Sequence, residues 1–251
     1  MTMKSAILSC AAFVFSLAVF VATHVAAQEA AAPPKKAPRS VEADPNLPNV
    51  LILGDSISIG YTPYVRDILK GKANVYRPAT ADGKHPINCG NTKMGLAGID
   101  KWLGDTKWDV IHFNWGLWDM SYRYPQNQDN KGERTKVKGA ISFTPEQYAE
   151  NLEKLVERLE KTGAKLIWGS ISLVPDGEEG RVLGDDLRFN EAAAKVMKKH
   201  NIPIDDINAL TRTFDASARM AANDVHYKGE YSQKIAVQVA DWIEKSLPKK
   251  K

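Results

Sequence analysis

Short apolar runs alternate with amphipathic stretches along most of the chain. The runs predict five buried strands, at 50–53, 74–76, 110–113, 166–168 and 202–204. Apolar residues at helical spacing predict helices at 64–69, 94–103, 144–163, 185–200 and 230–247. Strands separated by helices of this length imply βαβ units. We therefore expect an α/β fold with a mainly parallel five-stranded sheet and helices on both faces.

The strongest local signal is the start of the helix at Thr144. Thr144 is a capping residue, Pro145 suits the first turn, and Gln147 completes a capping box. The buried face of this helix is predicted to consist of Tyr148, Leu152, Leu155 and Leu159. Gly163 is expected to end it.

The N-terminal segment has a different character from the rest. Lys4 precedes an apolar run from Ala6 to about Ala22, and small residues follow at Val25-Ala26-Ala27. This pattern predicts a signal peptide over 1–27, cleaved before Gln28, with an uncleaved anchor as the alternative. A Pro/Ala/Lys linker over 28–47 and one domain over 48–248 follow. We expect an exported protein, periplasmic or extracellular, without stable membrane association after cleavage.

The composition is that of an ordinary globular protein, with 43% hydrophobic and 25% charged residues. The formal net charge of +4 comes from scattered basic residues and argues against a nucleic-acid partner. Cys10 leaves with the signal peptide, so Cys89 is left without a partner for an internal disulfide. A lone cysteine also argues against a structural zinc site. The oligomeric state is left open.

Ligands of parallel α/β folds bind beyond the carboxyl ends of the strands. Ser56 follows the first predicted strand in Gly54-Asp55-Ser56, where its hydroxyl is either a nucleophile or a helix cap. A serine nucleophile needs a base, and His226 lies just before the last predicted helix. His112 lies inside a predicted strand and is better interpreted as a core residue.

Four segments together resemble the SGNH hydrolases, also called GDSL esterases and lipases. They are Val50–Ile57, Asn88–Thr92, Asn114–Asp119 and Asp224–His226, in the order of that family. The resemblance implies a flavodoxin-like three-layer α/β/α sandwich that needs no metal or organic cofactor. It also implies that Ser56 attacks an ester carbonyl with His226 as base. The oxyanion hole would consist of the N–H groups of Ser56 and Gly90 and an asparagine amide.

Two positions depart from the family pattern. Trp118 stands where the family has the asparagine of its third block, so Asn114 is the alternative amide donor. Asn223 stands where the family has its aspartate, and Asp224 follows one residue later. We predict that Asp224 orients His226, with Asn223 or a simple Ser–His dyad as alternatives.

Possible substrate contacts are Asp55, Asn91, Trp118 and Asp119. The aromatic residues Trp115, Trp118, Tyr122 and Tyr124, together with Arg123, suit an acylated and acidic carbohydrate, although Trp115 is at least as well explained as a core residue. The expected partner is therefore a small-molecule or polysaccharide ester. Two alternatives remain: a non-catalytic glycan-binding protein with this fold, and an acyltransferase.

Overall fold

The computed structural model describes residues 43–124 and 135–249. The predicted signal peptide and most of the predicted linker lie outside the described residues, so both stay predictions. A polar segment between 122 and 139 also lies partly outside. Its ends form a short antiparallel pair, β4 (Tyr122–Arg123) with β5 (Ala140–Ile141).

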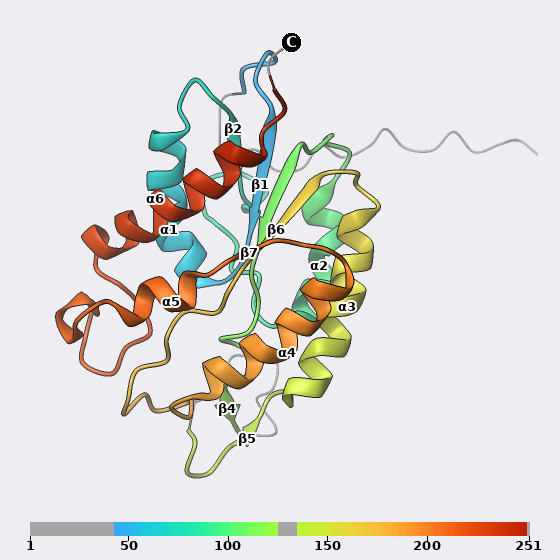
Figure 1. The fold of residues 1–251 in the computed structure, drawn as a ribbon. Helices are drawn as coiled ribbons and strands as arrows, with labels where there is room; N and C mark the ends of the chain where they lie inside the picture. The colour runs from blue at the N-terminus through green and yellow to red at the C-terminus, as the bar shows by residue number, and fades with distance from the viewer. Residues whose placement is uncertain (1–42, 125–134, 250–251) are drawn as a thin grey trace, which may run out of the picture. The chain divides into compact units, whose positions relative to one another are not determined.

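The main sheet consists of five parallel strands, which confirms the prediction. They are β1 (Asn49–Leu53), β2 (Asn74–Tyr76), β3 (Val110–Phe113), β6 (Lys165–Gly169) and β7 (Ile204–Asp205). Their order in the sheet is β2-β1-β3-β6-β7 (Figure 1). The chain therefore leaves β1 first toward one edge of the sheet and then returns to its other side. The carboxyl ends of β1 and β3 lie on either side of this switch point, where a ligand site is expected.

Helices cover both faces of the sheet and complete the predicted three layers. In Figure 1, α1 (Ser56–Ile68) and α6 (Gly229–Ser246) lie on one face, and α2 (Thr92–Leu103), α3 (Pro145–Glu160) and α4 (Asp185–Lys199) on the other. A short helix, α5 (Ile207–Arg212), and a 3₁₀ turn at Ala216–Ala218 connect β7 to α6. None of the described helices has the length and apolar character that crossing a membrane requires.

The α3 helix matches its sequence signal closely. Thr144 Oγ1 accepts the Gln147 N–H while Gln147 Oε1 accepts the Thr144 N–H, so both halves of the capping box are present. The predicted face of Tyr148, Leu152, Leu155 and Leu159 is buried. Gly163 follows the helix with φ of +71°, a left-handed conformation that glycine adopts readily.

Two predicted starts are wrong, and one helix was not predicted. Helix α1 begins at Ser56 rather than Tyr64, because the Asp55 side chain caps it and the helix accommodates Pro63 in its interior. Strand β7 begins at Ile204 rather than Ile202. Helix α5 was not predicted, since six residues are too few to show a periodic pattern.

A buried polar cluster joins the middle of the sheet to α6. The His112 Nε2 and Asp205 Oδ2 atoms lie 2.9 Å apart, and both side chains are 0% exposed. The Gln238 amide donates to Asp205 Oδ1 over 2.6 Å. His112 is thus a core histidine with a partner, as expected. Removing one member of such a cluster leaves the others buried without a partner.

We predict that Asp205→Ala lowers the free energy of unfolding by about 3 kcal/mol, because it leaves the buried His112 without its partner and removes the acceptor of the half-buried Gln238 amide. Urea denaturation of the mature domain measures this change. Asp241→Ala, which removes the exposed Asp241–Lys245 pair, is the matched control and should change little. Equal losses for the two variants would contradict a structural role of the cluster.

Candidate active site

A tight turn between β1 and α1 carries Ser56. Ser56 is the first residue of α1 and is half-buried, while the Asp55 Oδ1 atom accepts the Ile57 N–H over 2.9 Å. A Cβ atom on Gly54 would lie 2.8 Å from Ser58 Oγ, so the turn closes tightly only with glycine there. The predicted capping role therefore belongs to Asp55, which leaves the Ser56 hydroxyl available for chemistry.

The loop before α6 brings His226 to this hydroxyl. His226 Nε2 lies 2.8 Å from Ser56 Oγ, although the two residues are 170 positions apart. On the other side of the ring, His226 Nδ1 lies 2.7 Å from Asp224 Oδ1, which also accepts the His226 backbone N–H over 3.0 Å. Asp224, Ser56 and His226 thus form one continuous chain of hydrogen bonds. This is the geometry that a serine nucleophile requires.

Asn223 stands where the family has the aspartate that orients the histidine, but here it forms a backbone turn instead. Its φ is +64°, a left-handed conformation that asparagine tolerates better than most residues. Its side chain is exposed, and the described contacts of the His226 ring are to Asp224 and Ser56. The shift of the acid by one residue is therefore absorbed by a turn at Asn223.

Arg219 holds the His226 loop in place, which the sequence pattern did not indicate. Its two terminal nitrogens donate to the carbonyls of Val225 and Leu173, each over 3.0 Å. The guanidinium carbon lies 4.3 Å from the centroid of the Tyr227 ring. Together these contacts fix the residues on both sides of His226, and an imidazole held in this way needs little reorganisation for proton transfer.

Arg77 holds the turn that carries Ser56, as Arg219 holds the loop that carries His226. This buried side chain donates to Ser58 Oγ over 3.2 Å and to the Ile87 carbonyl over 3.0 Å, with a longer contact of 3.4 Å to the Gly54 carbonyl. It therefore ties the Ser56 turn to the loop that leads to Gly90. A lone arginine after a short strand carries no sequence signal for this role.

The three predicted oxyanion donors differ in their surroundings. The Gly90 N–H already donates to Asn88 Oδ1 over 2.9 Å, and the Asn114 amide donates to the Gly169 carbonyl over 2.6 Å. A substrate oxyanion at Gly90 would replace the Asn88 oxygen, and one at Asn114 would use its second amide hydrogen. The Ser56 N–H lies at the N-terminus of α1, where the helix dipole favours negative charge. These roles stay predictions.

Three of the predicted substrate contacts are wrong, because their side chains are buried and hold the fold together. Asp55 caps α1, and the Asn91 Oδ1 atom accepts the Met94 N–H to cap α2. Asp119 accepts the Thr92 N–H over 3.0 Å and the Thr92 hydroxyl over 2.5 Å. Burial raises the pKa of Asp119 to about 7, and the bonds from Thr92 oppose that rise.

The aromatic residues after β3 divide into core and surface. Trp115 is fully buried, and its indole N–H donates to the Cys89 carbonyl over 3.3 Å, so it is a core residue. Arg123 is also buried, with its guanidinium carbon 5.1 Å from the centroid of the Trp118 ring. Trp118 is half-buried and remains a candidate substrate contact.

Cys89 is buried, and burial raises the pKa of its thiol to about 12. It is thus a packed thiol, as expected. Over 43–124 and 135–249, no group of three or more His, Cys, Asp or Glu side chains is arranged to hold a metal ion.

A five-stranded parallel sheet in this order, with helices on both faces, is a fold shared with known esterases. No protein-family model and no curated protein matches the sequence. Among solved structures, a lipase/acylhydrolase from Enterococcus faecalis has a TM-score of 0.62 at 18% identity, covering 81% of this chain and 99% of that chain. The acetyl xylan esterase AlAXEase has a TM-score of 0.58 at 15% identity, covering 78% and 99%.

A third neighbour, a protein from Slackia heliotrinireducens assigned as an SGNH hydrolase, has a TM-score of 0.52 at 18% identity and covers 79% of this chain and 100% of that chain. The resemblance that the sequence motifs indicate is thereby confirmed for the fold. At these identities the similarity concerns the fold alone.

The raised pKa of Asp119 predicts a dependence of stability on pH. In the folded protein Asp119 keeps its proton up to a pKa of about 7, whereas the ordinary pKa of an aspartate, which applies to the unfolded chain, is 3.8. Between these values the folded state binds the extra proton, so stability falls as pH rises. The contribution is fully present below about pH 4 and is lost above about pH 7.

Asp119→Asn removes this titration while keeping an oxygen for the Thr92 donors. We predict that the stability of the wild type relative to this variant falls by about 3 kcal/mol between pH 4.5 and pH 7.5. Urea denaturation of both proteins across that range measures the difference. A constant difference, or one that grows with pH, would show that Asp119 is ionised in the folded protein throughout.

Proposed function

We propose that this protein is a serine esterase of the SGNH type that works through an acyl-enzyme on Ser56. The observation that carries the proposal is the hydrogen-bond chain from Asp224 through His226 to Ser56. An isolated serine hydroxyl is a weak nucleophile, and a base at 2.8 Å with its own carboxylate partner is what activates it.

The reaction has two halves. Ser56 Oγ attacks the ester carbonyl carbon while His226 Nε2 takes the hydroxyl proton, and Asp224 stabilises the resulting imidazolium. His226 then gives this proton to the departing alcohol oxygen, which leaves Ser56 acylated. A water molecule repeats the sequence in the second half, releasing the carboxylic acid and restoring Ser56. The oxyanion in each half is held by the Ser56 N–H and by Gly90 and Asn114.

The substrate we propose is a short acyl ester, most simply an acetyl group, on a carbohydrate. One structural neighbour is named an acetyl xylan esterase and another a lipase/acylhydrolase. Half-buried aromatic side chains at Trp118, Tyr122 and Tyr124 support a sugar rather than a lipid, since aromatic faces suit sugar rings. The absence of an extended apolar stretch around the motifs argues in the same direction.

The non-catalytic alternative loses much of its support. It relied on Trp118 and Asn223 standing where the family has functional residues. Asp224 supplies the carboxylate that Asn223 lacks, and a binding protein would have no need for the contact between His226 and Ser56. An acyltransferase shares the acyl-enzyme and differs only in the acceptor. We also propose export, on the basis of the apolar segment near the N-terminus.

Hydrolysis of p-nitrophenyl acetate by the mature domain tests the proposed reaction. We predict that Ser56→Ala and His226→Ala each lower kcat/KM by at least about 1000-fold, because each removes a member of the nucleophile–base pair. Asp224→Asn should lower kcat by about 100-fold or more, because an amide stabilises the imidazolium less. The kcat/KM for p-nitrophenyl acetate should exceed that for p-nitrophenyl octanoate.

Asn223→Gly is the matched control for Asp224→Asn. Glycine adopts the left-handed conformation of this position, so activity should stay within about threefold of wild type. Circular dichroism checks that each variant folds. Folded wild type without turnover, or activity that survives in Ser56→Ala, would refute the esterase proposal.

A further inference from the structure

The turn at 116–121, which follows β3, carries Trp118 beside the candidate active site. We call these residues the Trp118 turn. The Leu117 side chain lines the same small cavity as Ile57, the residue after Ser56. Trp118 is half-buried, so part of its side chain is accessible. An aromatic side chain in this place can contact a sugar unit whose ester is bound at Ser56.

Hydrogen bonds fix the backbone on both sides of the Trp118 ring. Arg181 Nε donates to the Leu117 carbonyl over 2.6 Å. The Ser121 hydroxyl donates to the Trp118 carbonyl over 2.9 Å, and Arg123 Nε in turn donates to Ser121 Oγ over 3.1 Å. The Arg123 guanidinium also lies over the Trp118 ring, so it supports the ring. The turn is therefore ordered before a ligand binds, which lowers the entropic cost of binding.

Arg181 is itself held by a buried ion pair. Arg181 Nη1 lies 3.0 Å from Glu178 Oε1, and the two side chains are 3% and 4% exposed. Glu178 Oε2 accepts the Gly180 N–H over 2.8 Å, and the Gly180 carbonyl accepts the Tyr122 N–H over 2.7 Å. A guanidinium with a fixed carboxylate partner has little freedom, so its bond to the Leu117 carbonyl has a defined direction.

The segment that contains Arg181 also contacts the loop that carries His226. A Cβ atom on Gly177 would lie 2.8 Å from Asn223 Nδ2, so the two loops pack closely there. Arg181 acts on the turn of the nucleophile as well. Burial raises the pKa of Asp55, and the nearby charge of Arg181 is among the causes that oppose this rise. Arg181 thus lies where the loops after β1, β3 and β6 meet.

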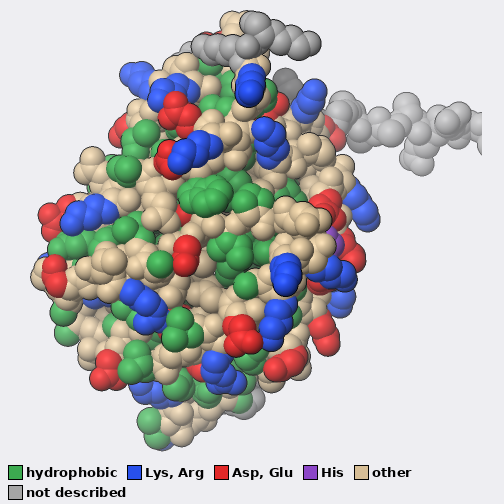
Figure 2. All heavy atoms as spheres, viewed as in Figure 1, with side chains coloured by type: hydrophobic (Ala, Val, Ile, Leu, Met, Phe, Trp, Pro, Cys, Tyr) green, Lys and Arg blue, Asp and Glu red, His purple; other side chains and the backbone are tan. Residues whose placement is uncertain are grey.

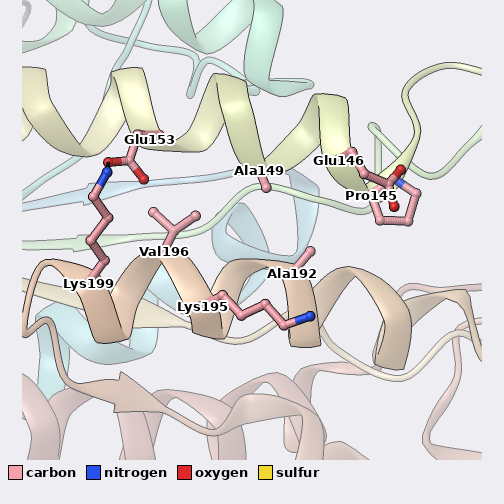
Figure 3. A pocket seen from close by; sticks show the side chains of 8 residues that line it. All are labelled: Pro145, Glu146, Ala149, Glu153, Ala192, Lys195, Val196 and Lys199. Carbon is pink, nitrogen blue, oxygen red and sulfur yellow. Dashed lines mark hydrogen bonds and ion pairs between the residues drawn. The ribbon is translucent and has the colours of Figure 1, made fainter.

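A larger hollow lies on the face of the sheet opposite α1. It is formed by α3 and α4, has a volume of about 310 Å³, and carries both signs of charge (Figure 3). Lys199 Nζ lies 2.6 Å from Glu153 Oε1 and Lys195 Nζ lies 2.9 Å from Glu191 Oε1, so these cations have partners. On the face that Figure 2 shows, basic and acidic side chains are likewise interspersed. Neither feature indicates a charged ligand, and the Trp118 turn offers a sugar an aromatic ring rather than a charge.

We propose that Arg181 is a positioning residue that holds Trp118 in place to bind the sugar unit of the ester substrate. The inference rests on the proposed esterase and names the side chain that sets its affinity for the sugar. Arg181 is buried and acts through the Leu117 carbonyl, so it does not touch the substrate itself. Without this bond the Trp118 turn gains freedom, and sugar binding has to order it again.

Kinetics with two acetyl esters test this role. Acetylated xylo-oligosaccharides carry sugar units, whereas ethyl acetate carries the same acyl group without them. We expect Arg181→Met to raise KM for the xylo-oligosaccharides about tenfold with little change in kcat, because it weakens sugar binding and leaves the nucleophile and base in place. The kcat/KM for ethyl acetate should stay within about twofold of wild type. Arg188→Met is the matched control, since Arg188 forms an i, i+3 pair with Asp185 but is 63% exposed; it should change neither substrate.

Chemical rescue separates a missing donor from a damaged fold. Guanidinium ion at low concentration should lower the raised KM of Arg181→Ala, because it can take the place of the missing head group, whereas a denaturant acting on a damaged fold would raise KM further. Should Arg181→Met not fold, the double variant Glu178→Gln/Arg181→Met removes both charges, keeps an acceptor for the Gly180 N–H, and should show the same selective rise. An equal fall in kcat/KM for both esters, or a change for neither, would overturn the proposal.

Calorimetry with Ser56→Ala provides a readout that does not depend on turnover. Acetylated xylo-oligosaccharides should bind this variant, and adding either Arg181→Met or Trp118→Ala should weaken binding about tenfold. Absence of binding, or equal affinity with and without Arg181→Met, would refute the positioning role even if the esterase is active. A selective loss of binding while wild type hydrolyses nothing would refute the esterase and keep the role of Arg181.

Discussion

The hydrogen bond between Ser56 and His226 is the contact on which the chemistry of this protein depends. It joins the start of the first helix to the loop before the last one. Neither residue reaches the other through local structure. The parallel sheet brings them together, because the connections that follow the neighbouring strands β1 and β3 leave toward opposite faces of the sheet, and such a switch point has a crevice beyond the carboxyl ends of the strands. Helices α1 and α6 then pack on the same face of the sheet, which places the His226 loop over the N-terminus of α1.

Two buried arginines hold the two chain segments that make this contact. Arg77 ties the Ser56 turn to the loop before Gly90, and Arg219 ties the His226 loop to the segment after β6. Each donates to backbone carbonyls or hydroxyls, and these hydrogen bonds fix the geometry of the two loops.

Sequence patterns predicted the layers of the fold because strand burial and helix periodicity are local properties. Val50–Leu53 and the Thr144 capping box are examples in which a few adjacent residues determine the element. The start of α1 was missed because small and polar residues in its first turns hide the helical periodicity of apolar positions. The helix nevertheless begins at Ser56, because the Asp55 side chain caps it. The pairing of Ser56 with His226 was inferred from motifs. The contact of Asp224 rather than Asn223 required the backbone turn at Asn223 to be known.

Residues with burial-dependent roles were the least predictable. Asp55, Asn91 and Asp119 have side chains typical of a binding site, yet each is enclosed and bonds to a helix start or to Thr92. The sequence alone does not distinguish a carboxylate that caps a helix from one that contacts a ligand, because both follow a strand. The positioning roles of Arg77 and Arg219 were not predicted either, because long-range hydrogen bonds to backbone carbonyls leave no local pattern in the sequence.

Covalent labelling by a fluorophosphonate, followed by peptide mass spectrometry, tests the central claim most directly, because the reagent reacts with an activated serine without needing the natural substrate. We predict one adduct per protein, on the peptide that contains Ser56, and labelling slowed by about 1000-fold or more in His226→Ala. An unlabelled protein, or an adduct on another serine, would contradict it.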